Sequence, residues 1–312
     1  MDKVFEQVVI LLAMMAVGFV AAKARIITEN GRNLLTKLVL YVTQPFLIIN
    51  SFQMAYSADV LMQMGIVAVF AVLSMGGFYL LGSFALPRKD DGKRRVLWQS
   101  MVFSNCGFMG IPVLGSLFGD AGVIYASVYI LVFTVFTWTL GIYIYAGKTG
   151  SWREVLLQPG LIAVIVGLVL FLTGVRLPEW AVKDIFSQVG SLTTPLAMMI
   201  VGALVAEGDF RSVFRDLSLF GSAAIRLVAL PALSLGMFWL LHSLGLPGLP
   251  AAGSPVVVAC VLITAMPVAA NVAIFASMYS VRPQYAAQTV VVSTLLSVAT
   301  VPLWMFVLRM LS

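Results

Sequence analysis

An uncharged run from Val96 to Gly119 limits most strongly what this chain can fold into. A helix that crosses a bilayer needs about 20 predominantly apolar residues, and this run is long enough to supply them. Its centre, residues 104–112, reads Ser-Asn-Cys-Gly-Phe-Met-Gly-Ile-Pro, and both Gly and Pro are poor helix formers. Backbone groups that are freed at membrane depth must find partners in protein or in a water-lined cavity. The run therefore predicts a helix broken next to a ligand site, with a ligand-free proline kink as the alternative.

The composition sets the class of protein. Hydrophobic residues make up 61% of the 312 residues and charged residues only 10%, whereas a soluble domain carries about 25% charged residues. The chain is therefore expected to be an all-α, polytopic membrane protein. Asp2 beside Lys3, with no clear small-residue cleavage site after them, indicates a retained first span. Cys106 and Cys260 lie in apolar runs without metal-ligand spacing, so we expect no metal and no cofactor.

Ten membrane-spanning helices are predicted from the apolar runs. Their approximate bounds are residues 4–22, 37–54, 60–86, 96–117, 121–146, 159–174, 185–206, 217–241, 255–280 and 285–308. The first five occupy residues 1–146 and the second five residues 159–312, with residues 147–158 as a connector. The loops are too short to hold a soluble domain.

The distribution of Lys and Arg orients these spans. Most of the 19 positive residues fall in the odd-numbered loops, above all in those after the first and third spans. Positively charged residues stay on the cytoplasmic side. Both termini are therefore predicted to face outward, which is the periplasm if the protein lies in a bacterial inner membrane.

The two halves of the chain share interruptions at matching places. Thr43-Gln44-Pro45 in the second span corresponds to residues 193–195, Thr-Thr-Pro, in the seventh. Pro112 in the fourth span corresponds to Pro267 in the ninth, and each has an Asn close by. Because five crossings are an odd number, a repeated half would be inverted. Paired interruptions in inverted repeats point to the binding site of a transporter, although ten spans also offer chance pairings.

Three motifs carry a resemblance to a known family. They are residues 104–112, Pro-Val-Ala-Ala-Asn at residues 267–271 and Arg-Leu-Val-Ala-Leu-Pro at residues 226–231. With them, essentially the whole chain resembles the auxin efflux carrier family of PIN-like carriers, and within it the bacterial malonate-transporter-like members. The long cytoplasmic loop of some plant members has no counterpart here.

The resemblance implies a fold similar to that of bile-acid symporters and sodium/proton antiporters. Spans four and nine would be broken and would cross at Pro112 and Pro267. Spans one, two, six and seven would form a scaffold, and spans three to five and eight to ten a transport domain that moves against it like an elevator. The resemblance also implies a homodimer formed through scaffold helices.

The candidate substrate-binding residues lie around the two interruptions. Asn105 and Asn271 can donate and accept hydrogen bonds and cost less to desolvate than a charged side chain, which suits a carboxylate. For Asn105 the alternative role is to satisfy the break, and for Asn271 it is to cap a half-helix. Lesser candidates are Ser104, Gly107, Thr264 and Gln44.

Polar groups elsewhere in the spans have simpler explanations. Thr43, Asn50, Thr193 and Thr194 are expected to form inter-helix hydrogen bonds rather than to contact a ligand. Arg226 lies deep in the eighth span, where an intramembrane Arg must face a cavity, a partner or backbone carbonyls. It could attract an anionic substrate or tie the half-helix ends, and the resemblance favours the tie.

These features favour a secondary transporter of a small organic anion, a mono- or dicarboxylate similar to malonate or auxin. Partners would be that anion, the lipid bilayer and, for coupling, H+ or Na+ or neither; nucleic acid is not expected. An enzyme is disfavoured because no nucleophile with a base and no pair of mid-membrane carboxylates is evident. The alternatives are an ion-coupled symporter of another amphipathic solute, or a membrane sensor or channel.

Overall fold

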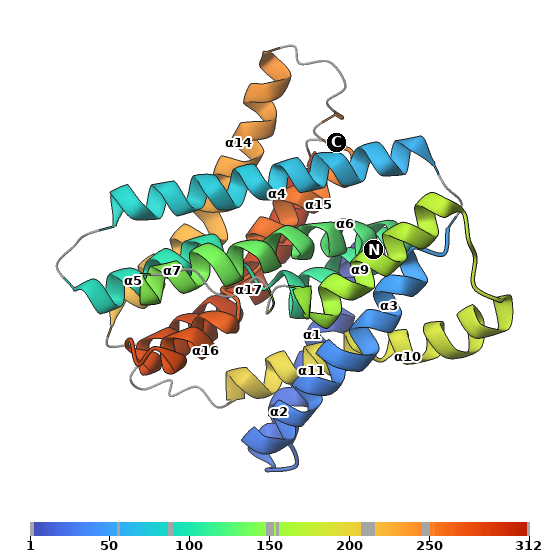
Figure 1. Ribbon diagram of the computed structural model, residues 1–312. Helices are drawn as coiled ribbons and strands as arrows, with labels where there is room; N and C mark the ends of the chain where they lie inside the picture. Colours follow the sequence, from blue (N-terminus) through green and yellow to red (C-terminus); the bar gives the residue numbers. More distant parts are fainter. Residues whose placement is uncertain are drawn as a thin grey trace. The chain divides into compact units, whose positions relative to one another are not determined.

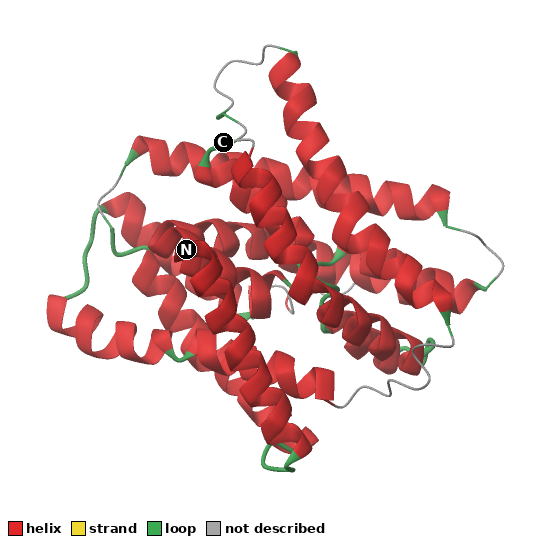
Figure 2. Ribbon diagram, turned by 180° about the vertical axis from the view of Figure 1, so that it is seen from behind, coloured by secondary structure: helices red, strands yellow, loops and turns green. Residues whose placement is uncertain are grey.

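The computed structural model describes residues 3–54, 57–86, 90–147, 153, 156–206, 216–244, 250–251 and 253–310. Throughout these residues the regular structure is helical, and strand-like pairing is limited to one isolated bridge (Figures 1 and 2). Most of the predicted connector at residues 147–158 lies outside the described residues.

Six helical segments of the described chain are long and apolar enough to cross a membrane, and three shorter apolar helices accompany them. The six are Glu29–Ser51, Ala58–Ala85, Cys106–Ala146, Asp184–Ala206, Leu217–Ser243 and Pro283–Met310, and the shorter ones are Val9–Lys23, Pro159–Thr173 and Pro255–Ala265. The all-helical, multi-pass membrane class is thereby confirmed. The count of ten spans and the inverted repeat stay predictions.

The chain divides into two compact units. The first comprises Met1–Ala68, Gly107–Val135 and Ser151–Glu207, and the second comprises Val69–Cys106, Phe136–Gly150 and Gly208–Ser312. The assignment of a scaffold and a transport domain to particular spans stays a prediction.

The first unit is built around two tightly packed helices, α1 (Lys3–Lys23) and α11 (Thr193–Ala206). Their backbones approach at glycines: a Cβ on Gly18 would lie 2.2 Å from the Met199 oxygen, and one on Gly202 would lie 1.9 Å from the Met15 oxygen. Small residues permit such contacts between membrane helices. The order of the paired residues makes the two helices antiparallel.

A second layer of the first unit contains α2 (Glu29–Leu38), the π-helical segment η1 (Val39–Thr43) and α3 (Gln44–Ser51) in succession. Thr28 caps α2 by accepting a hydrogen bond from the Gly31 N–H. This helix therefore begins well before residue 37, where the apolar run begins, because a cap and not hydrophobicity sets its start. The unit also contains α9 (Pro159–Thr173), which packs on α3, then η4 (Ala181–Phe186), α10 (Ser187–Ser191) and most of α6 (Ile111–Phe136).

The α6 helix turns sharply at Gly119, whose φ of 59° is outside the helical region. Glycine tolerates a positive φ because it has no Cβ. A Cβ on Gly122 would lie 2.0 Å from the Leu114 oxygen, so the two limbs of this turn pack closely. The turn separates the runs that were predicted as spans four and five.

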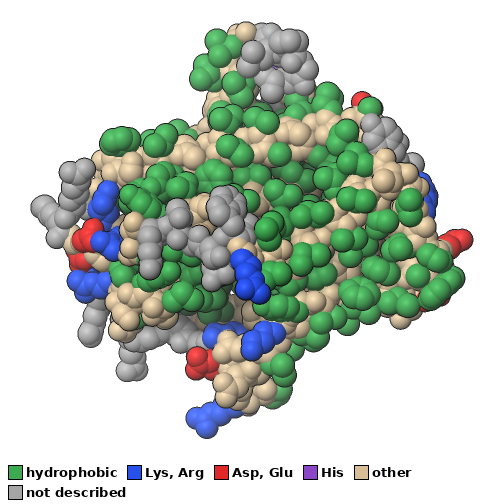
Figure 3. Space-filling view, viewed as in Figure 1, with side chains coloured by type: hydrophobic (Ala, Val, Ile, Leu, Met, Phe, Trp, Pro, Cys, Tyr) green, Lys and Arg blue, Asp and Glu red, His purple; other side chains and the backbone are tan. Residues whose placement is uncertain are grey.

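The second unit contains the later part of α4 (Ala58–Ala85), α5 (Asp91–Val102), η3 (Thr137–Gly141) and α7 (Ile142–Ala146). It continues with α13 (Leu217–Ala224), η5 (Ile225–Ala229), α14 (Leu230–Ser243), α15 (Pro255–Ala265), α16 (Asn271–Met278) and α17 (Pro283–Met310). Large apolar side chains are exposed on α4, including Val69, Leu80 and Phe84, and hydrophobic side chains cover much of the face in Figure 3. Such a surface suits contact with lipid.

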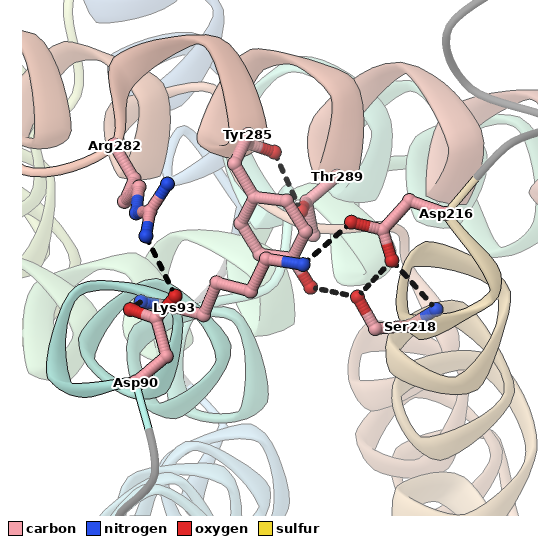
Figure 4. A network of polar contacts seen from close by, with 7 residues as sticks. All are labelled: Asp90, Lys93, Asp216, Ser218, Arg282, Tyr285 and Thr289. Atoms are coloured by element: carbon pink, nitrogen blue, oxygen red, sulfur yellow. Dashed lines mark hydrogen bonds and ion pairs between the residues drawn. The ribbon is translucent and has the colours of Figure 1, made fainter.

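One polar network joins the N-terminal ends of α5, α13 and α17 (Figure 4). Lys93 Nζ lies 2.6 Å from an Asp216 carboxylate oxygen, and Arg282 Nη2 lies 2.7 Å from one of Asp90. Asp90 and Asp216 also cap α5 and α13. The hydrogen bond from Lys93 holds the pKa of Asp216 below its usual value, and the same bond raises the pKa of Lys93.

Candidate functional site

Two helices of the second unit end inside the buried core. The α5 helix ends at Val102 and α15 ends at Ala265, and the backbone becomes extended at the next residue of each chain segment. Helical structure resumes at η2 (Cys106–Gly110) and at α16. The predicted interruptions are thus present, and each lies among side chains that are almost fully buried.

The two interruptions pair with each other. The Asn105 N–H donates to the Pro267 oxygen at 2.7 Å, and the Ala269 N–H donates to the Phe103 oxygen at 3.0 Å. Between these bonds lies an antiparallel bridge centred on Ser104. Each broken segment therefore supplies partners for backbone groups that the other has lost from its helix, which an apolar interior requires.

A side chain of α17 satisfies a further backbone group at the pairing. The Val268 N–H donates to Ser293 Oγ at 3.1 Å, and that hydroxyl donates to the Val290 oxygen at 3.0 Å. A hydroxyl can donate and accept at the same time, so Ser293 serves both its own helix and the interruption.

Arg226 joins the C-terminal ends of the two interrupted helices. Its Nη1 donates to the Met101 oxygen at 2.7 Å, in the last turn of α5. Its Nε donates to the oxygen of Met266, which directly follows α15, at 3.1 Å. The side chain is 1% exposed. These two bonds have the geometry expected of a tie between the half-helix ends.

The position of Arg226 depends on an irregular part of its own helix. It belongs to the π-helical segment η5, and Pro231 follows at the start of α14. Because Pro231 has no N–H, the Leu227 carbonyl cannot receive the usual helical hydrogen bond from it. Trp304 on α17 replaces that bond, with its Nε1 donating to the Leu227 oxygen at 2.7 Å.

Asn271 begins α16 and reaches toward the end of the predicted fifth span. Its Nδ2 lies 3.5 Å from Oγ1 of Thr137, the first residue of η3. Its Oδ1 is buried and has no hydrogen-bond partner among the described residues. The amide is thus held on one side and keeps an acceptor on the other.

The remaining predicted residues of the second unit are placed as follows. Ser104 is fully buried, and its Oγ has no partner in the described part of the chain. Thr264 Oγ1 donates to the Val261 oxygen at 2.7 Å within α15, which is a local helix bond. Asn105 is 5% exposed. Ser104, Asn105, Thr264, Pro267 and Asn271 therefore lie at or next to the paired interruptions.

Three predicted residues belong to the first unit. Gln44 begins α3 and is 4% exposed, Gly107 lies in η2, and Pro112 lies in the first turn of α6. Pro112 is thus not among the paired backbone residues, which begin earlier, at Phe103. Thr43 and Thr193 are both buried, and neither Oγ1 has a partner among the described residues, so the hydrogen bonds expected for them are not seen.

Sequence reasoning missed three side chains that hold this site, namely Thr137, Ser293 and Trp304. None of the three lies in a recognisable motif. Only Trp304 had a possible signal, because Pro231 in the middle of the predicted eighth span leaves a carbonyl that needs a donor.

The described residues contain no group of three or more His, Cys, Asp and Glu side chains that could hold a metal ion. Buried, paired helix breaks in a multi-pass helical protein are features of membrane transporters. The family model described as "Membrane transport protein" matches residues 3–151 and 148–305. The chain belongs to this family, that of the PIN-like auxin efflux carriers.

Similar proteins carry transporter names. An "Uncharacterized transporter" of Methanothermobacter thermautotrophicus is 26% identical over 97% of this chain and 98% of its own length. The "Uncharacterized transporter MJ1031" of Methanocaldococcus jannaschii is 25% identical over 97% and 98%. The "Uncharacterized transporter YfdV" of Escherichia coli K12 is 24% identical over 97% and 96%. Family and relatives together identify a membrane transporter and point away from an enzyme.

Proposed function

We propose that the protein is a secondary transporter of a small organic anion, a mono- or dicarboxylate similar to malonate or auxin. The observation that carries this proposal is the pairing of two interrupted segments in the buried core of the second unit. Membership of a membrane transport family supports transport as the activity. The nature of the substrate rests on the chemistry of the interruptions.

Two features of the interruptions favour an anion. Helix N-termini carry partial positive charge, and α16 begins at Asn271 directly beyond the pairing. Asn105 and Asn271 add neutral amides, which can donate to a carboxylate without the desolvation cost of a second ionised group. Nδ2 of Asn271 has one long contact, 3.5 Å from Thr137 Oγ1, and its second N–H can donate to a carboxylate.

The movement that we propose is alternating access of the elevator type. Spans three to five and eight to ten would carry the substrate past a scaffold of spans one, two, six and seven. We further propose a homodimer in a bacterial inner membrane, with both termini on the periplasmic side.

Uptake into proteoliposomes tests the function. Purified protein is reconstituted, and the uptake of radiolabelled malonate, other short dicarboxylates and indole-3-acetate is measured. Asn105→Ala should lower uptake of the best substrate by about tenfold or more, because a hydrogen bond to a charged group contributes roughly 1.5–3 kcal/mol. Asn33→Ala, which removes an exposed amide on α2, is the matched control. Normal uptake by a folded Asn105→Ala protein would contradict the site, and no uptake of any carboxylate by the wild type would contradict the function.

A further inference from the structure

The carbonyl ends of two helices meet at the paired interruptions. The C-terminus of a helix carries roughly half a negative charge on its unpaired carbonyls. With α5 and α15 both ending there, such carbonyls would attract a cation and repel a carboxylate. An anion-binding site at this place therefore needs something positive on those carbonyls.

The guanidinium of Arg226 supplies that positive group. Its Nη1 and Nε donate to one carbonyl from each helix end, at 2.7 Å and 3.1 Å. A guanidinium presents several donors in a rigid plane and keeps its charge at all physiological pH values. An ammonium group is a single point charge and matches two separate carbonyls less well.

We propose that Arg226 is a positioning residue that determines the charge specificity of the site. It acts as a built-in cation that neutralises both helix ends, so that an organic anion binds without a metal cation bound beside it. This inference rests on the proposed function. It adds to that function that anion binding requires a positive charge at residue 226 and that transport does not depend on sodium.

The surroundings of Arg226 hold it in this role. The Trp304 hydrogen bond to the Leu227 oxygen fixes the backbone next to it, at the place where Pro231 removes a helical bond. The guanidinium therefore remains on the carbonyls of Met101 and Met266. A mobile surface arginine would not provide a permanent counter-charge.

The test measures KM and maximal rate in proteoliposomes for the wild type, Arg226→Gln and Arg226→His, with Arg176→Gln as an exposed control. Each protein is assayed at pH values about one and a half units either side of ~6.5, where an imidazole changes charge. Each is also assayed with sodium and with choline as the only monovalent cation. The wild type measured in parallel corrects for titration of the substrate itself.

We expect Arg226→Gln to raise the KM for the anion by about tenfold or more, since buried carbonyls lose a charged donor. Arg226→His should approach the wild-type KM at the acidic pH and the Arg226→Gln KM at the alkaline pH. Wild-type uptake should be equal in sodium and choline, and Arg176→Gln should behave as the wild type does. A residue with only a structural role would lower the amount of folded protein without making KM depend on pH.

A wild-type KM in folded Arg226→Gln would overturn the inference, as would sodium-dependent uptake by the wild type. An Arg226→His protein that is impaired equally at both pH values would also overturn it. If the variants do not fold, the comparison of sodium with choline in the wild type decides alone. If the wild type transports no carboxylate in any buffer, the proposed function fails; if it transports one and only the Arg226 results disagree, the inference alone fails.

Discussion

Replacement of Gly202 by Ala should destabilise the first unit through the contact between α1 and α11. A Cβ at residue 202 would lie 1.9 Å from the Met15 carbonyl oxygen, whereas such a contact normally exceeds 3.4 Å. The neighbouring atom is backbone, so no side-chain rotation relieves the overlap and the helices must move apart. Overpacking of this kind costs about 1–3 kcal/mol. At about 2 °C for each kcal/mol in a chain of this size, the melting temperature should fall by about 2–6 °C.

The measurement is thermal unfolding of the purified protein in detergent, followed by intrinsic fluorescence. Gly65→Ala is the matched control, because the same methyl group is added to an apolar helix where no atom lies within 4 Å. That variant should unfold at or slightly above the wild-type temperature, since alanine is the better helix former. Equal stability of Gly202→Ala and the wild type, or an equal loss in both variants, would refute the close helix contact.

Two further predictions concern the second unit. Trp304→Phe should lower the free energy of unfolding by about 1–3 kcal/mol, because the buried Leu227 carbonyl loses its donor. Denaturant unfolding measures the loss, with the exposed Trp239→Phe as the control. No loss of stability would mean that the hydrogen bond is unimportant. The Lys93–Asp216 pair should make stability depend on pH, because the pKa of Asp216 is lowered by folding. Above the pKa of the unfolded carboxyl group the ion pair contributes its full stabilisation, and this contribution is lost as the pH falls through the lower pKa of Asp216 in the folded protein. Asp216→Asn should remove this part of the dependence of stability on pH. The effect is under about 1 kcal/mol because both side chains are partly exposed.

The sequence was sufficient to predict local structure at residues whose chemistry allows few backbone conformations or few partners in a membrane. Two Gly and a Pro close together in an apolar run, as at residues 104–112, weaken a helix at membrane depth, so a break was predicted there. A charge in the eighth span had to meet a partner or carbonyls, so Arg226 was recognisable as unusual. The length of the apolar runs alone indicated that the chain contains membrane-spanning helices.

The partners across the breaks were not predictable in the same way. That Val268 would use Ser293, and Leu227 would use Trp304, depends on how α17 packs against segments distant in sequence. The break before Pro112 begins at Phe103 because the chain there becomes extended to pair with its partner segment. Proline marked the region, but the backbone that changes conformation precedes it.

The paired interruptions should behave as one thermodynamic element. The Asn105 N–H bonds to the Pro267 oxygen and the Ala269 N–H bonds to the Phe103 oxygen, so neither segment can lose its extended form without leaving groups of the other unpaired. Arg226 adds a bond to each side of the same element. Buried polar groups that share partners lose stability together, and mutations in such a network are not additive. Loss of the extended form in one interruption should therefore destabilise the other, even though the two lie far apart in sequence.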